Sequence, residues 1–274
     1  MKDTSRNAVQ ADAVLLTDHP APGAARLTLN RPAQRNSLSR ELMQRMTEAL
    51  NELAADAGVR VILLGAQGPA FCAGHDLREI TGARSEDDKG RAFFEATMAE
   101  CSTLMQTIVE TPKPVIARVH ATATAAGCQL VASCDLAVAG RAAYFATPGV
   151  NIGLFCSTPM VALARNVGRK HAMEMLLTGE PIDADQAATM GLVNRAVADD
   201  ELDQAVMALA ESIAGKSGRT LAIGKAAFYR QLEMPLADAY AYASEVMVHN
   251  MLTADAQEGI GAFLDKRSPT WTHQ

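Results

Sequence analysis

The feature of this sequence that most restricts its fold is a regular alternation of strand-like and helix-like segments between residues 61 and 139. Val61–Leu64 is apolar without interruption, as in a strand that is buried on both faces. Val115–Val119 and Leu136–Ala139 have the composition of the next two strands. Apolar residues repeat at helical spacing from Phe94 to Ile108, and residues 127–133 form a shorter helical pattern. This β-α-β-α-β order predicts a parallel sheet with right-handed crossovers.

The segment that precedes this alternation predicts a hairpin followed by a helix. Val14–Leu16 and Arg26–Leu29 are short strand-like runs separated by turn residues. Ser39 is a suitable N-cap for a helix whose apolar residues recur from Leu42 to Leu53. Residues 81–89 are polar and predict a mobile loop between elements of the alternating region.

From about Thr158 onward the patterns are mostly helical. One stripe runs from Leu202 to Ile213, Pro235 can open a helix that ends near Leu252, and residues 192–197 are strand-like. A helical tail of this size cannot build a large core of its own. We therefore predict a core over residues 1–200 and a helical region over residues 201–274 that packs on the core and on a neighbouring subunit.

Composition narrows the classes of partner. The chain has 25 Lys and Arg against 31 Asp and Glu, a net charge of −6, and no basic cluster, which argues against nucleic acid. No apolar run approaches the roughly 20 residues of a membrane span. Met1–Gln10 is polar and has no apolar signal-peptide core, so we expect a cytosolic protein without membrane insertion. The five cysteines form no CxxC pair, which predicts free buried thiols and no metal site.

Two turns rich in small residues follow predicted strands and are the first candidates for a ligand site. They are Phe71–Leu77 and Ala121–Gly127, and the second leads into the helical pattern at 127–133. Phosphate-binding GxGxxG and GxxxxGK[ST] loops are absent from the sequence. Turns at the carboxyl ends of neighbouring strands can aim two backbone N–H groups at one oxygen, and a helix N-terminus adds its positive end. The same small residues can also serve close packing alone.

Four ordered blocks carry a family resemblance: FCAGHDL at 71–77, the block at 113–139, FATPGVNIGLF at 145–155, and the block at 168–197. Together they resemble the enoyl-CoA hydratase/isomerase (crotonase) superfamily from about Leu15 to Lys266. The resemblance implies an α/β spiral of β-β-α units with a helical C-terminal trimerisation region. It also implies a homotrimer or dimer of trimers that binds an acyl-CoA thioester.

The resemblance assigns roles to particular residues. The backbone N–H groups of His75 and Ala126 would form an oxyanion hole that polarises the thioester carbonyl and stabilises an enolate. Coenzyme A would enter as part of the substrate, and no separate cofactor or metal is implied. The residues assigned to coenzyme A contact are Arg35, Ala73, Asp76, Leu77, Phe263 and Lys266, the last two from the C-terminal tail and often reaching a neighbouring subunit.

The sequence departs from the family pattern where the chemistry would occur. Hydratases of the family use two glutamates, and the matching positions here are Gln129 and Gly149. Ser157 stands where other members place an aspartate. A carboxamide has no titratable proton near neutral pH, so binding and carbonyl polarisation should remain while hydration is slow or absent.

These departures leave several functions open. The chain could be an enzyme that acts on an acyl-CoA thioester, or a non-catalytic acyl-CoA binder or sensor. A third reading is a thioester hydrolase that uses Cys156 or Ser157 with a nearby base. The imidazole of His75 could act as an acid or base, or could simply be satisfied by a loop carbonyl. Asp76 could orient His75 or tie the turn to backbone N–H groups.

Overall fold

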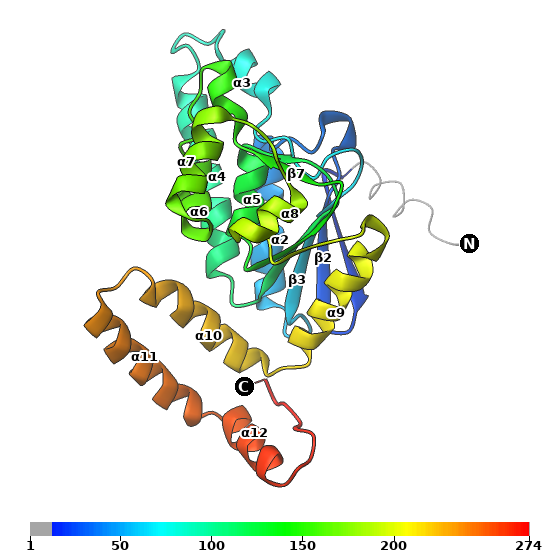
Figure 1. Ribbon diagram of the computed structural model, residues 1–274, viewed down its shortest axis with the longest axis vertical. Helices are drawn as coiled ribbons and strands as arrows, with labels where there is room; N and C mark the ends of the chain where they lie inside the picture. Colours follow the sequence, from blue (N-terminus) through cyan, green and yellow to red (C-terminus); the bar gives the residue numbers. More distant parts are fainter. Residues whose placement is uncertain (1–12, 274) are drawn as a thin grey trace.

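The computed structural model describes residues 13–273, so the prediction made for Met1–Gln10 lies outside the described residues. A six-stranded sheet forms its centre, in the order β1-β2-β3-β4-β6-β9 (Figure 1). Its strands are β1 (Leu15–Ala21), β2 (Ala24–Leu29), β3 (Val61–Ala66), β4 (Val115–Val119), β6 (Leu136–Gly140) and β9 (Arg195–Val197). β1 and β2 pair antiparallel, and each other neighbouring pair is parallel. The predicted hairpin and parallel sheet are confirmed.

The two faces of β3 show why its sequence is apolar without a break. Ile62 and Leu64 join the large core, which is covered by three helices on one face of the sheet. Val61 and Leu63 point to the other face and pack against a single helix. The covering helices are α2 (Arg40–Ala55), α4 (Arg91–Glu110) and α5 (Ala126–Ser133) on the first face, and α9 (Leu202–Ala214) on the second. Burial of each of the four side chains from Val61 to Leu64 stabilises the fold by about 1.5–3 kcal/mol.

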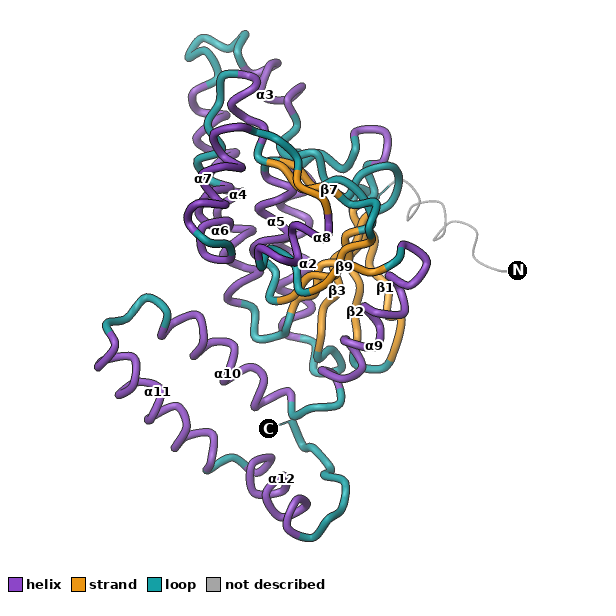
Figure 2. Tube along the Cα trace, viewed as in Figure 1, coloured by secondary structure: helices purple, strands orange, loops and turns teal. Residues whose placement is uncertain are grey.

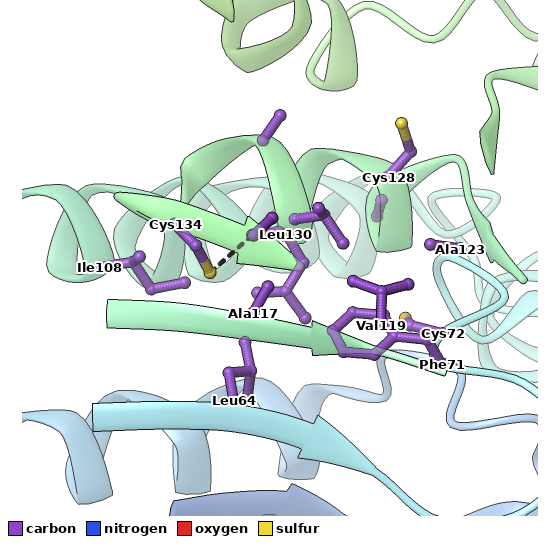
Figure 3. Packing of buried hydrophobic residues seen from close by; sticks show 14 of the residues in the cluster. Leu64, Phe71, Cys72, Ile108, Ala117, Val119, Ala123, Cys128, Leu130 and Cys134 are labelled. Atoms are coloured by element: carbon purple, nitrogen blue, oxygen red, sulfur yellow. Dashed lines mark hydrogen bonds between the residues drawn. The ribbon is translucent and has the colours of Figure 1, made fainter. Parts of the chain in front are cut away.

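The packing of β4 against α5 fixes the place where the second small-residue turn emerges. Ala117 lies below Leu130, and Val119 lies beside Phe71 (Figure 3). The Cys134 thiol donates to the carbonyl oxygen of Leu130 at 3.3 Å, which satisfies it within α5. All five cysteines are free and buried, as predicted. The start of α5 is thereby held over the end of β4.

A second, three-stranded sheet and a set of short helices lie above the carboxyl ends of the main strands (Figure 2). The strands are β5 (Ala123–Thr124), β7 (Tyr144–Ala146) and β8 (Ile182–Asp183). The helices are α3 (Leu77–Ala83), α6 (Pro159–Asn166), α7 (Arg169–Thr178) and α8 (Ala184–Met190), and the 3-10 turns are η1 (Pro32–Gln34), η2 (Pro148–Ile152) and η3 (Asp199–Glu201). The prediction of a loop over 81–89 was wrong at its start, because α3 extends to Ala83 under an Asp76 N-cap.

Three helices extend away from the core and form what we call the C-terminal arm, residues 218–264 (Figure 1). They are α10 (Gly218–Gln231), α11 (Leu236–Met251) and α12 (Ala254–Leu264). Large apolar side chains of the arm are exposed within the described chain, among them Phe228, Leu236, Tyr240, Leu252 and Phe263. The boundary near residue 200 remains a prediction.

One buried ion pair attaches the arm to the core. The Lys225 ammonium donates to the Asp135 carboxylate at 2.7 Å and to the carbonyl oxygens of Ile108 and Lys113 at 2.9 and 3.0 Å. The Tyr229 hydroxyl donates to the other Asp135 oxygen at 3.0 Å. All three ammonium protons therefore have an acceptor although the Lys225 side chain is only 6% exposed. Burial lowers the pKa of Lys225, and the Asp135 carboxylate opposes that shift.

Candidate active site

The first turn lies between two neighbouring segments of backbone. On one side, the N–H of Thr124 donates to the Cys72 carbonyl oxygen at 2.9 Å. On the other side, the N–H of Leu38 donates to the Gly74 carbonyl oxygen at 2.7 Å. In a trans peptide, the C=O and the following N–H point in opposite directions. The N–H of His75 therefore points away from Leu38, toward the edge where residues 122–126 lie.

The second turn begins α5 and presents an N–H group of its own. Ala125 has φ 51° and ψ −118°, and its N–H donates to the Ala146 carbonyl oxygen at 2.9 Å. Ala126 is the first residue of α5, so its N–H has no partner within the helix. Neither this N–H nor that of His75 donates to another group within residues 13–273. Two free donors thus emerge from adjacent turns.

Close glycine contacts bring the two turns together. A β-carbon on Gly74, which has φ 91°, would lie 3.4 Å from the Ala126 nitrogen and 2.9 Å from the Ala125 β-carbon. A β-carbon on Gly127 would lie 2.1 Å from the Cys72 carbonyl oxygen. Real β-carbons do not approach other atoms so closely, so glycine at 127 is required for α5 to start against the first turn. This tertiary contact explains the small residues in both turns.

Gln129 and Gly149 stand at the two positions where hydratases of the family carry glutamate. The first holds a buried amide, and the second has no room for a side chain. Gln129 is buried in α5, and its Oε1 accepts a weak hydrogen bond from the Cys101 thiol, with sulfur and oxygen 3.9 Å apart. Gly149 is sterically closed, because a β-carbon there would lie 2.4 Å from the Leu154 carbonyl oxygen and 2.9 Å from the Cys156 sulfur. The Leu154 N–H donates back to the Gly149 carbonyl oxygen at 2.9 Å. The loop after Gly149 thus occupies the space a side chain would need.

The structure distinguishes the readings left open for His75 and Asp76. The Nε2 atom of His75 is buried and has no hydrogen-bond partner among the described residues, so no loop carbonyl satisfies it. Burial lowers the pKa of His75, which favours the neutral imidazole. Asp76 does not bond the imidazole. Its Oδ1 accepts from the Arg78 N–H at 3.1 Å, and its Oδ2 accepts from the Arg31 guanidinium at 2.9 Å. Asp76 therefore ties the turn.

Neither candidate nucleophile has a base beside it among residues 13–273. The Ser157 hydroxyl donates to the Phe155 carbonyl oxygen at 3.3 Å. Burial raises the pKa of the Cys156 thiol, although a hydrogen bond from the Gly149 backbone opposes the rise. Burial also raises the pKa of Cys72 and of Cys128 to about 12. All three thiols are therefore protonated at neutral pH, and a hydrolytic mechanism lacks an activated group here.

The residues assigned to coenzyme A contact separate into two groups. Ala73 lies in the first turn, and its N–H donates to the Arg35 carbonyl oxygen at 3.1 Å. Leu77 is half exposed at the start of α3, next to Asp76. Phe263, which is 82% exposed, is part of α12, and Lys266 follows that helix; α12 lies at the far end of the C-terminal arm, away from α3 (Figure 1). A single chain therefore does not bring these tail residues to the two turns.

Within residues 13–273, no group of three or more His, Cys, Asp or Glu side chains is placed to hold a metal ion. The helices between these same limits are each too short or too polar to cross a bilayer.

The fold and the paired turns define a protein class, and comparison with known sequences agrees. The sequence model of the enoyl-CoA hydratase/isomerase family matches residues 21–274, so the chain belongs to this family. It is 46% identical over 251 residues to the rat protein named enoyl-CoA hydratase domain-containing protein 3, mitochondrial, covering 92% of this chain and 82% of the relative. It is 48% identical over 260 residues to the Xenopus laevis protein of the same name, covering 95% and 86%.

Solved structures give the same result. A crystal structure of enoyl-CoA hydratase from Mycobacterium smegmatis superposes with a TM-score of 0.91 at 52% identity, covering 95% of this chain and 99% of the other. The human enoyl-CoA hydratase domain-containing protein 3 superposes with a TM-score of 0.90 at 45% identity, covering 94% and 100%. The predicted α/β crotonase fold with its helical C-terminal region is thus confirmed.

The location predicted from the sequence was wrong. The polar N-terminus led us to expect a cytosolic protein, but the rat and Xenopus relatives are both named mitochondrial. A polar N-terminal segment excludes an apolar secretory signal core. It does not exclude the polar, amphipathic type of targeting segment, and this is the physical reason for the error.

Proposed function

We propose that this chain is an acyl-CoA-binding enzyme that holds a thioester carbonyl oxygen between the His75 and Ala126 N–H groups. The observation that carries the proposal is the direction of these two free donors, which emerge from turns in contact with each other. Such a pair stabilises the negative charge that develops on the oxygen of an enolate. One donor of this kind is worth about 10²–10³ in rate.

The proposed reaction does not include efficient hydration. Adding water across a double bond needs a positioned acid and base, each worth about 10²–10⁴. Gln129 offers an amide without a titratable proton, and the Leu154 carbonyl leaves no room for a side chain at Gly149. Polarisation of the thioester carbonyl therefore remains the expected chemistry. It acidifies the proton on the carbon beside the carbonyl, and this proton exchanges through the neutral imidazole of His75 or through water, with hydration of a 2-enoyl-CoA slow or absent.

A second function, non-catalytic binding or sensing of acyl-CoA, is favoured by the same two positions. The two functions share the carbonyl site and differ only in turnover. A hydrolase is the weakest alternative, because Cys156 and Ser157 have no base within reach among the described residues. Release of free coenzyme A that Ser157→Ala or Cys156→Ala abolishes would be needed to support it.

We extend the proposal to the assembly. The exposed apolar side chains of the C-terminal arm support contact with further copies of this chain as a trimer or a dimer of trimers. In such an assembly, Phe263 and Lys266 would reach the coenzyme A of a neighbouring subunit, since α12 lies away from α3 of its own chain (Figure 1). Sedimentation equilibrium tests this: a monomeric mass at micromolar concentration would contradict it.

The central test removes one hydrogen-bond donor without changing a side chain. Replacing alanine 126 by its α-hydroxy analogue converts the backbone N–H into an ester oxygen. The matched control is the same replacement at Ala254, an exposed alanine that is likewise the first residue of a helix. Wild-type and both ester proteins would be incubated with saturated, 2-enoyl and 3-hydroxyacyl thioesters in deuterated water, and the products measured by mass spectrometry.

The expected result is deuterium uptake or product formation that falls about 10²–10³-fold in the ester at 126 and not in the ester at 254. Tight binding without any product would favour the non-catalytic binder. Equal deuterium uptake and product formation by the two ester proteins would refute the proposed carbonyl site.

A further inference from the structure

The segment immediately before α2, residues 31–38, runs along the back of the His75 turn, and we call it the strap. Backbone hydrogen bonds join the strap to the turn: Ala73 N–H to Arg35 O at 3.1 Å, Leu38 N–H to Gly74 O at 2.7 Å, and Asp76 N–H to Leu38 O at 3.0 Å. The last two bonds lie on either side of His75. They fix the planes of the peptide units before and after it, and so the direction of its own N–H.

Asn36 anchors the middle of the strap. It is completely buried, and it adopts a left-handed conformation with φ 53°. Its Oδ1 accepts from the Arg31 N–H at 2.8 Å, and its Nδ2 donates to the Gln67 and Ala70 carbonyl oxygens at 2.7 and 2.8 Å. Both amide protons are therefore used. Asparagine suits this position because it tolerates left-handed backbone better than other side chains do.

Arg31 anchors the strap to the far side of His75. Its guanidinium donates to the Asp76 carboxylate at 2.9 Å and to the Ser37 carbonyl oxygen at 2.5 Å. The Ser37 hydroxyl donates to the same Asp76 oxygen at 3.2 Å. The Arg31 and Asp76 side chains are only 16% and 9% exposed, so this ion pair is shielded from solvent. Arg31 thus joins the strap to the turn directly, and Asn36 joins the strap to residues 67–70, which lead into the turn.

We propose that Arg31 and Asn36 are positioning residues that hold the His75 N–H toward Ala126 and so set how strongly a bound carbonyl is polarised. Gly74, with φ 91°, lies in a region that glycine enters freely. The torsional preference of glycine alone does not hold the Gly74–His75 peptide in one orientation, and the strap supplies a constraint. This inference rests on the proposed function.

The experiment measures polarisation directly. Butyryl-CoA with an isotope-labelled carbonyl carbon is bound to the full-length protein, and the labelled C=O stretch is followed by infrared difference spectroscopy. Hydrogen bonding to the carbonyl lowers this frequency. The variants are Arg31→Met, Arg31→Lys, Asn36→Gly and Ser37→Ala. The control is Arg45→Met, because Arg45 forms an exposed ion pair with Glu48 on α2.

We expect the frequency downshift to fall by more than half in Arg31→Met and Asn36→Gly, to recover partly in Arg31→Lys, and to stay complete in Arg45→Met. The affinity for coenzyme A without an acyl group is measured in parallel and should remain unchanged in Arg45→Met. Ser37→Ala keeps the proposal testable if Arg31→Met and Asn36→Gly prevent folding, and it should reduce the frequency downshift by a smaller amount. Variants that bind butyryl-CoA with the full wild-type downshift would overturn the strap proposal alone. A wild-type protein that binds butyryl-CoA with no downshift would overturn the proposed function itself.

Discussion

The carbonyl oxygen of Leu154 lies in the space that any side chain at Gly149 would need. It is 2.4 Å from the position that a β-carbon on residue 149 would occupy. The N–H of Leu154 also donates to the Gly149 carbonyl oxygen, so the two residues close a tight loop. The absence of a glutamate at this position is therefore built into the backbone path, and restoring one would require the loop to move.

This relationship predicts a large difference between two glycine substitutions. Gly149→Ala should destabilise the protein by about 1–3 kcal/mol, because the added methyl overlaps a backbone oxygen. Gly149→Glu should cost at least as much and should not create a hydratase. Gly82→Ala is the control: no atom lies within 4 Å of its β-carbon position in α3, so stability should rise slightly. Urea unfolding curves measure both, and equal midpoints would contradict the overlap.

The strained backbone at Ala125 predicts a stabilising mutation. A non-glycine residue with φ 51° and ψ −118° stores about 1–3 kcal/mol of strain. Ala125→Gly should relieve it at an entropic cost of about 0.5–1 kcal/mol, for a net gain of about 1 kcal/mol. The same substitution at Ala49, within α2, should instead lose about 1 kcal/mol. Thermal unfolding of both variants checks the opposite signs, and a loss at both positions would show that Ala125 is not strained.

The Lys225–Asp135 ion pair predicts that one substitution in the C-terminal arm lowers the stability of the protein. Lys225→Met leaves the Asp135 carboxylate without its buried cation and should cost about 3–5 kcal/mol. Lys216→Met, at an exposed position, should have little effect. The double variant Lys225→Met with Asp135→Asn should lose less than the sum of the two single changes, because the uncompensated charge is gone. Denaturant unfolding is measured for wild type, Lys225→Met, Asp135→Asn, the double variant and Lys216→Met, and strict additivity would exclude coupling between Lys225 and Asp135.

The buried imidazole of His75 predicts a pH effect near neutrality. Its pKa is lower in the folded protein than the ordinary value of 6.5, so the unfolded chain binds the proton more tightly. The neutral imidazole of His75 makes its full contribution to the free energy of unfolding above pH 6.5. This contribution falls as the pH drops from 6.5 toward the pKa of His75 in the folded protein. We expect wild type to lose stability as the pH falls below about 6.5, and His75→Ala to lose less.

The control for this pH effect is His19→Ala, because His19 is exposed on β1. It should keep the wild-type slope of unfolding free energy against pH. A His75→Ala protein with the same slope as wild type would show that the imidazole is not responsible.

Much of the fold follows from local patterns. The unbroken apolar run Val61–Leu64 predicted a strand covered on both faces, and its side chains do alternate between two cores. Ser39 accepts from the Leu42 N–H as the expected N-cap of α2. The seven-residue helix α3 was missed, because a helix this short is stabilised by its Asp76 cap and its tertiary contacts more than by its own sequence.

The candidate site could be located from the sequence only as two turns of small residues. The sequence motif named His75 and Ala126, but the strap residues Asn36 and Ser37 were missed and Arg31 was not assigned a role. The available signal was the asparagine within a polar turn, a residue type that favours left-handed backbone.

The sequence by itself determined which segments form strands and helices, which of their faces are apolar, and which carboxylates are missing, because each of these depends on residues close together along the chain. Only the tertiary structure decided that the Gly149 position is closed, that Arg31 reaches Asp76, and that Lys225 ties the arm to the core. These three features depend on atoms brought together from distant or folded-back parts of the chain, and periodicity carries no information about such approaches.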